Sequence, residues 1–66
     1  MKTEEEIVKH LRLTYGASLL TKREIATELG VSRATIDRMR LEGEIESIII
    51  RKQVRFKFSE LIRLIT

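Results

Sequence analysis

The stretch from Thr21 to Arg40, TKREIATELGVSRATIDRMR, carries the signals that decide the fold of this 66-residue chain. Thr21 and Glu24 have the spacing of a capping box, in which two side chains satisfy free amide groups at the start of a helix. A helix is therefore expected to begin at Lys22. It ends at Gly30, because glycine readily adopts the positive φ angle that closes a helix.

A second helix follows almost at once. Ser32 is a favourable N-cap, so this helix is expected to run from Arg33 to about Glu42, where Gly43 closes it. Helices this short are not stable alone and must pack on one another. Ala26 is small enough to let the two helices cross closely. The apolar residues placed to fill the space between them are Ile25, Leu29, Val31, Ile36 and Met39.

This pattern predicts a helix-turn-helix over residues 21–43, with the second helix free to enter the major groove of DNA. Arg33 is the first candidate for a base contact, because arginine can donate two hydrogen bonds to guanine. Its alternative role is an ion pair with Asp37, four residues on. Arg38 can reach a base or a phosphate, and its alternative is an ion pair with Glu42. The candidate DNA-facing residues of this helix are Ser32, Arg33, Ala34, Thr35, Asp37 and Arg38.

After Gly43 the hydrophobic period changes from that of a helix to that of a strand. Residues 54–58 alternate apolar and basic side chains, and residues 45–50 are rich in β-branched side chains, which predicts a hairpin over 45–58. A three-residue loop at 51–53 is expected to join the strands. The loop length decides which side chains share a face. With this loop, the core-facing residues are Ile48, Ile50, Val54 and Phe56, and the outward-facing residues are Arg55 and Lys57.

The segment 51–57 holds four cations and no acid, although the net charge of the chain is only +3. Such a strip suits a polyanionic partner, and its alternative role is to keep an exposed edge strand soluble. Lys22 and Arg23, at the start of the first helix of the pair, are expected to touch the DNA backbone. The expected contacts of the hairpin are Arg51, Lys52, Gln53 and Arg55.

Two further helices frame these elements. One is expected within residues 1–16, from about Glu4 to Tyr15, with Thr3 as its cap and Gly16 at its end. Its apolar side consists of Ile7, Val8, Leu11 and Tyr15. His10 has no clustered metal ligands around it and is expected to be a surface residue. The other helix covers residues 59–66, with Ser59 as its cap and with Leu61, Ile62 and Ile65 packing back on the core.

From Leu20 to Ile65 the sequence resembles the excisionase-type, MerR-like winged helix-turn-helix family. The matching residues are Leu20-Thr21, Glu24-Ile25-Ala26, Leu29-Gly30-Val31-Ser32-Arg33, Thr35-Ile36, Arg38, Gly43-Glu44-Ile45, Val54-Arg55-Phe56 and Ser59-Glu60-Leu61. The resemblance implies a recognition helix in the major groove and a β-hairpin wing on the backbone or minor groove. The sequence departs from the family pattern at residues 51–53, where members usually carry a glycine in the wing turn. The N-terminal helix is also not a constant part of the family pattern.

The resemblance also implies a role in phage or mobile-element biology, as a recombination directionality factor or a small transcription regulator. Double-stranded DNA is the expected partner, with self-association, cooperative arrays on DNA or a recombinase as further partners. The rival interpretation is a protein-interaction module that uses the winged-helix surface or the acidic N-terminal helix. We expect a single domain over residues 1–66, mostly α with a small β-hairpin.

Composition argues against other classes of protein. There is no cysteine and only one histidine, so neither a disulfide nor a cysteine-based metal site is expected. The sequence has no glycine-rich phosphate loop, and so short a chain can hardly enclose a water-excluding active site. We therefore expect neither an enzyme nor a cofactor. The longest apolar run is Ile48-Ile49-Ile50, and the acidic N-terminus is unlike a signal peptide. A cytoplasmic protein, associated with the nucleoid when it binds DNA, is expected.

Overall fold

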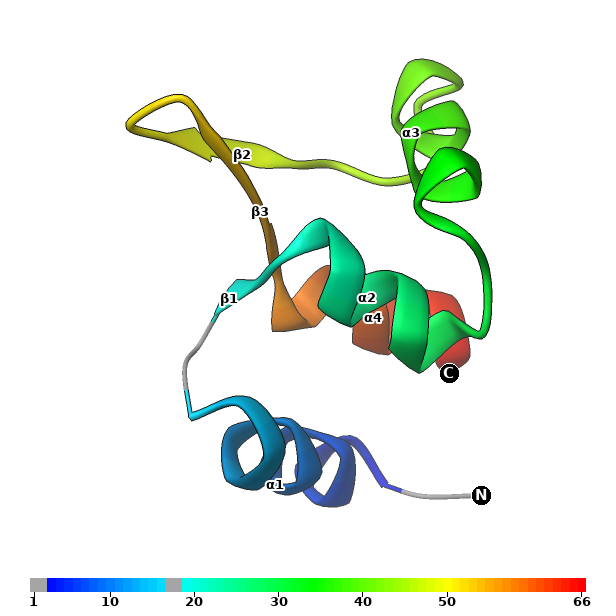
Figure 1. Ribbon diagram of the computed structural model, residues 1–66. Helices are drawn as coiled ribbons and strands as arrows, with labels where there is room; N and C mark the ends of the chain where they lie inside the picture. The colour runs from blue at the N-terminus through cyan, green and yellow to red at the C-terminus, as the bar shows by residue number, and fades with distance from the viewer. Residues whose placement is uncertain (1–2, 17–18) are drawn as a thin grey trace.

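The computed structural model describes residues 3–16 and 19–66 of the chain (Figure 1). These residues form helices and short strands in the order α1 (Glu4–Tyr15), β1 (Leu19–Leu20), α2 (Lys22–Leu29), α3 (Arg33–Leu41), β2 (Ile48–Ile50), β3 (Gln53–Lys57) and α4 (Phe58–Ile65). The predicted fold class is confirmed, since the chain is a mostly helical winged helix-turn-helix with a small antiparallel sheet.

The predicted caps of the helix-turn-helix are present. Thr21 Oγ1 accepts a hydrogen bond from the Glu24 amide at 3.1 Å, and Glu24 Oε1 accepts one from the Thr21 amide at 2.8 Å. Gly30 follows α2 with a φ angle of 70°, in the left-handed region that favours glycine. Ser32 Oγ then accepts a hydrogen bond from the Thr35 amide at 3.1 Å and begins α3. The chain thus ends one helix and starts the next within three residues.

Within the helix-turn-helix, the predicted core is confirmed except at Val31. Its buried members are Ile7, Leu11, Leu20, Ile25, Ala26, Ile36, Ile45, Phe56, Phe58, Leu61 and Ile62, with Leu29 and Met39 packed against them. Val31 is 37% exposed, so the expectation that it fills the space between α2 and α3 is wrong. Its amide donates to the Ala26 carbonyl, and the Gly30 amide donates to that of Thr27. This is a Schellman motif, which holds Val31 at the end of α2.

The sheet has a strand that the sequence did not predict. β1 pairs with β3 through Leu19 opposite Lys57 and Leu20 opposite Phe56, so the strand order is β1-β3-β2. The expected wing had two strands. Two leucines are too few to show the alternation that marks a strand. β1 nevertheless brings the fully buried Leu20 into the core, beside Phe56 of β3.

The register of the wing differs from the prediction by one residue. The turn is Arg51-Lys52 alone, since Gln53 already pairs with Ile50 in the ladder. Ile48 consequently lies opposite Arg55, on the same face of the hairpin, and not on the face of Val54 and Phe56. A shift of one residue exchanges the two faces of a strand. The expectation that Ile48 and Ile50 face the core beside Val54 is therefore wrong.

The last helix also differs in detail. α4 begins at Phe58, directly after β3, and its N-cap is Lys57, which makes no side-chain capping bond. The prediction that Ser59 caps this helix is thus wrong, since Ser59 lies in its first turn. Leu61 and Ile62 pack into the core as expected, whereas Ile65 is 43% exposed near the chain end.

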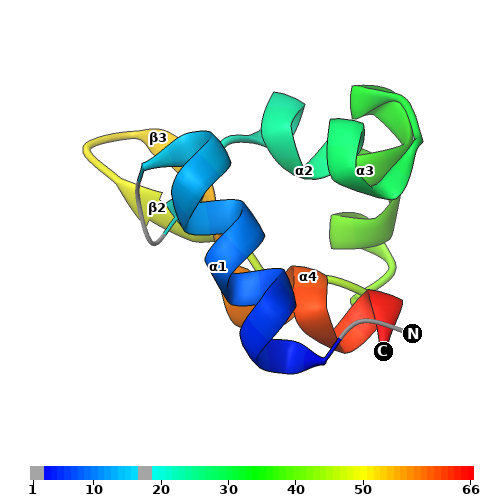
Figure 2. The ribbon, with the colours of Figure 1, turned by 90° about the horizontal axis from the view of Figure 1, so that it is seen from below.

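α1 packs on α4 and forms one side of the molecule. Thr3 caps it and Gly16, with φ 68°, ends it, as predicted. In Figure 1, α1 lies below α2 and α4, whereas α3 and the β2–β3 hairpin rise above them; Figure 2, seen from below, shows α1 in front of the hairpin and α4. α1 therefore leaves the outer side of α3 uncovered.

Polar contacts tie α1 to α2. Tyr15 Oη donates a hydrogen bond to Glu28 Oε2 at 2.7 Å, and His10 Nε2 lies 3.1 Å from Glu28 Oε1. Burial of the phenol, with the hydrogen bond to Glu28, raises the pKa of Tyr15 to about 12. His10 is exposed, as expected, and serves here as a contact between helices.

Candidate nucleic-acid interface

The outer face of α3 presents two exposed arginines. Arg33 lies in the first turn of the helix and Arg38 in the last, and both are exposed. The alternative ion pairs, Arg33 with Asp37 and Arg38 with Glu42, are not formed, and neither guanidinium has a polar partner among residues 3–16 and 19–66. Both groups can therefore meet a ligand without first breaking an internal contact.

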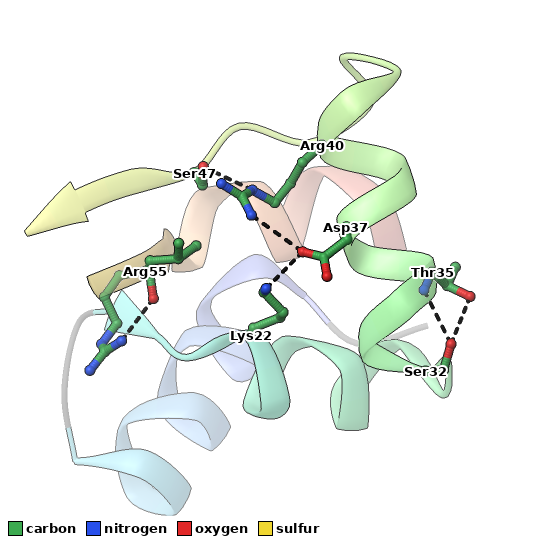
Figure 3. A network of polar contacts seen from close by, with 8 residues as sticks. Lys22, Ser32, Thr35, Asp37, Arg40, Ser47 and Arg55 are labelled. Carbon is green, nitrogen blue, oxygen red and sulfur yellow. Dashed lines mark hydrogen bonds and ion pairs between the residues drawn. The ribbon is translucent and has the colours of Figure 1, made fainter. Parts of the chain in front are cut away.

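The start of α3 is polar and lacks acidic residues. Ser32 and Ala34 are exposed, and Thr35 is half-buried. The Ser32 and Thr35 hydroxyls lie 3.0 Å apart, so they contact one another as well as the helix end (Figure 3). The first turn contains no acidic side chain, so the partial positive charge at the helix N-terminus is not neutralised locally. This end of α3 is thus suited to meet an anion such as a phosphate.

Asp37 is held in an ion-pair network (Figure 3). Its Oδ1 lies 2.7 Å from Lys22 Nζ on α2 and 3.3 Å from Arg40 Nη1 on α3. Arg40 Nε also donates to Ser47 Oγ at 3.1 Å, which connects α3 to the segment before β2. The hydrogen bond from Lys22, with that from Arg40, lowers the pKa of the Asp37 carboxyl. The network fixes α2, α3 and the start of the wing relative to one another.

Arg40 was not among the residues predicted for this site. It lies three residues after Asp37, a spacing at which helical side chains meet, and this was the available signal. Lys22 was expected to touch DNA, but its ammonium is directed to Asp37 and only 30% of its side chain is exposed. Arg40, at 27%, is similarly enclosed. Both cations lie beside the exposed face of α3 with their charge partly offset by one carboxylate.

The turn between α2 and α3 brings Arg23 to Arg33. Both line a shallow depression of about 350 Å³, together with Ala26, Thr27 and Val31. Arg23 is exposed, as a contact to the DNA backbone requires. The sequence predicted both residues separately, and the structure places them on one surface.

The wing tip is cationic and conformationally unusual. Arg51 and Lys52 have φ angles of 49° and 67°, in the left-handed region that non-glycine residues rarely adopt. Both side chains are exposed, as is that of Gln53. Arg55 is half-buried, because its guanidinium donates to the Val54 carbonyl at 2.7 Å and to Gln53 Oε1 at 2.9 Å. Of the four predicted wing contacts, Arg55 and Gln53 are thus joined by a hydrogen bond within the wing.

The sequence that forms these elements matches a known family of domains. The family model described as a helix-turn-helix domain matches residues 19–66, from β1 to the end of the chain. The chain belongs to this helix-turn-helix family. Helix-turn-helix domains act as DNA-binding modules, with the second helix of the pair as the reading element. A comparison with curated protein sequences gives no significant match.

The match leaves α1 outside the family region, so the chain carries α1 in addition to the elements that the family model covers. Two other features are absent from the part of the chain that the structure describes. No cluster of three or more histidine, cysteine, aspartate or glutamate residues there could hold a metal ion. Nor does any of its helices combine the length and hydrophobicity that crossing a membrane would require.

Proposed function

We propose that this helix-turn-helix domain binds double-stranded DNA sequence-specifically, with α3 in the major groove and the β2–β3 hairpin on the adjacent backbone or minor groove. The observation that carries the proposal is the pair of exposed arginines of α3, Arg33 and Arg38, which have no polar partner among the described residues. In Figure 1, α3 rises on the same side of the molecule as the hairpin. Guanidinium groups at such positions can read guanine or hold a phosphate.

Dimensions favour contact with two neighbouring grooves at once. The Cα atoms extend over 29 × 25 × 16 Å. Neighbouring major and minor grooves on one side of B-DNA are separated by about 17 Å, half of a helical turn. A molecule of this size can therefore place α3 in one groove and the wing tip in the next.

Each element has its own proposed role. Arg33 contacts a base, Arg38 contacts a base or a phosphate, and Ser32 and Thr35 lie where the start of α3 meets the backbone. Arg23, next to Arg33 at the turn, binds phosphate. The wing contributes Arg51, Lys52 and Gln53, whose side chains are exposed.

In its biological setting, we infer that the protein acts as an excisionase-like recombination directionality factor or as a small transcription regulator of a phage or mobile element. A single small reading head makes few base contacts, so tight specificity requires several copies on neighbouring sites or a partner such as a recombinase. The polar link from α1 to Glu28 supports treating α1 as part of the same DNA-binding unit.

Footprinting on the DNA that flanks the protein's own gene tests the proposal. We expect a protected site with contacts in one major groove and the adjacent minor groove, and affinity that falls steeply with salt. If the protein binds no duplex at micromolar concentration and low salt, the DNA-binding proposal is wrong and the protein-interaction alternative gains support.

A further inference from the structure

Two isoleucines at the wing tip are exposed to solvent. Ile49 is 60% exposed and Ile50 is 45% exposed, directly before the Arg51-Lys52 turn. Adjacent residues of a strand point to opposite faces, so each face of the hairpin carries one of these side chains near its tip. Exposed aliphatic side chains on a small domain gain free energy when a partner covers them.

The turn that follows has a strained backbone, and both of its residues are cations. Two-residue hairpin turns with both φ angles positive usually contain asparagine and glycine, whereas this turn is Arg51-Lys52. Left-handed backbone is unfavourable for a residue with a Cβ atom, so the sequence retains two long cations at a conformational cost. Backbone strain of this kind is concentrated at functional sites.

We propose that Ile49 and Ile50 form an apolar wedge that enters the DNA minor groove, while Arg51 and Lys52 bind the phosphates on either side. The inference deepens the proposed function and rests on it. Charge complementarity identifies the occupant, because the apolar pair is continuous with the strip 51–57, which has four cations and no acid. Minor-groove proteins combine cations with inserted aliphatic side chains in the same way.

The hairpin is wider than the minor groove that its tip would enter. The minor groove of B-DNA is about 6 Å wide. The backbones of two paired strands alone are about 4.8 Å apart, and side chains on both faces make the hairpin wider than the groove. Entry of the tip therefore widens the groove and favours base steps that unstack easily. Such steps are pyrimidine–purine steps, and A·T pairs lack the guanine amino group that would obstruct an isoleucine.

A second copy of the chain is a weaker candidate for the same surface. β2 is an edge strand and could in principle pair with another β2. It has only three residues, however, and a specific protein interface buries about 800 Å² on each partner. Pairing would also bring two cationic tips near one another. Neither area nor charge favours a dimer through β2.

The test compares wild-type protein with an Ile49→Thr/Ile50→Thr variant on the duplex that the wild-type protein selects from a random pool. Threonine keeps the β-branched shape of isoleucine, so the strand is preserved while most of the apolar surface is lost. Leu13→Gln is the matched control, because Leu13 is 78% exposed but lies on α1, on the opposite side of the molecule. Thermal melts check that all three proteins are folded.

We expect the Ile49→Thr/Ile50→Thr variant to bind about tenfold more weakly, as expected for loss of the exposed parts of two aliphatic side chains from an interface. The Leu13→Gln variant should bind as the wild type does. The Ile49→Thr/Ile50→Thr variant should also bend the duplex less than the wild type does. Energy transfer between dyes at the two ends of the duplex measures this bend.

A base analogue makes the test specific to the minor groove. A G·C pair is first placed under the wing in the selected duplex, and its guanine is then replaced by hypoxanthine, which removes the minor-groove amino group and leaves the major-groove edge unchanged. Wild-type protein should bind the hypoxanthine duplex several-fold more tightly than the guanine duplex. The Ile49→Thr/Ile50→Thr variant should bind the two duplexes with equal affinity. Equal responses of the two proteins would overturn the wedge while leaving DNA binding intact.

Two other results would also contradict the inference. A wild-type dimer in sedimentation that becomes monomeric in the Ile49→Thr/Ile50→Thr variant would assign the surface to a second copy. Failure of the wild-type protein to select any duplex would overturn the proposed function itself, and the wedge with it.

Discussion

Lys22 on α2 and Asp37 on α3 form the shortest ion pair across the helix-turn-helix, with Nζ 2.7 Å from Oδ1. Asp37 also forms an ion pair with Arg40, and Arg40 donates a hydrogen bond to Ser47, which lies before the wing (Figure 3). One carboxylate therefore offsets two cations next to the proposed DNA surface. An acidic residue in this place reduces the attraction to any phosphate backbone, so that binding depends more on base contacts.

Replacing Asp37 with asparagine should increase non-specific DNA binding. Asp37→Asn removes a negative charge and releases Lys22 and Arg40, so affinity for random duplex at low salt should rise about 3–10-fold, with a salt dependence steeper by about one phosphate contact. The ratio of specific to non-specific affinity should fall. Fluorescence anisotropy titrations over a range of salt concentrations measure all three quantities.

Glu42→Gln is the matched control for this change. Glu42 is also acidic and lies at the end of α3, but it is exposed and has no ion pair within the described residues. It should produce a smaller increase in non-specific binding. Weaker binding of Asp37→Asn to random duplex would show that the network serves to position α3 and not to limit its charge.

At the wing tip, Lys52→Gly and Lys52→Ala separate conformational strain from charge. Both variants lose one cation, so both should bind all duplexes more weakly, with a salt dependence shallower by about one phosphate contact. Only glycine accepts the φ of 67° without strain. Lys52→Gly should therefore raise the free energy of unfolding by up to about 1 kcal/mol. The gain from relieving the backbone strain is partly offset, because glycine increases the conformational entropy of the unfolded chain.

Chemical denaturation checks this pair of variants. The alanine variant should show no comparable gain, because it keeps a Cβ atom in the same backbone conformation. A gain of equal size in both would indicate that charge repulsion at the tip, and not backbone strain, destabilises the hairpin.

Tyr15 should titrate at unusually high pH. It is the single tyrosine of the chain, so the ultraviolet absorbance of phenolate reports on it alone. Its pKa in the folded protein is raised from 10.0 to about 12 by burial and by the hydrogen bond to Glu28. The neutral phenol therefore stabilises the fold fully below pH 10, and this contribution is lost as the pH rises through about 12.

The spectroscopic titration and the stability should agree. Melting temperature should decrease over the same alkaline interval, and in denaturant the titration midpoint should return to near the ordinary value. In Glu28→Gln the midpoint should fall only partly, because burial is the larger cause of the shift. A midpoint near 10 in the folded wild-type protein would mean that α1 does not hold Tyr15 against α2.

The helix-turn-helix could be predicted from sequence because its signals are local. The capping box of Thr21 and Glu24, the left-handed Gly30 and the cap at Ser32 each depend on residues within a few positions. The exposed positions of Arg33 and Arg38 follow from helical periodicity once the caps are known. These local rules fixed the bounds of α2, and of α3 to within one residue.

The wing and the ion-pair network could not be predicted in the same way. The register of Ile48 opposite Arg55 depends on a two-residue turn made of Arg51 and Lys52, which lacks the usual asparagine and glycine. The strand at Leu19 exists because β3 pairs with it, and it is far too short to have its own signal. Contacts across elements of this kind are set by tertiary structure.

The most direct measurement is the affinity of Arg33→Ala for the selected duplex and for variants of that duplex at each base pair. Arg12→Ala, an exposed arginine on α1 away from α3, is the control. We predict that Arg33→Ala loses about 1–3 kcal/mol of binding free energy and its preference at one base pair, while Arg12→Ala retains both. Unchanged affinity and base preference in Arg33→Ala would contradict the placement of α3 in the major groove.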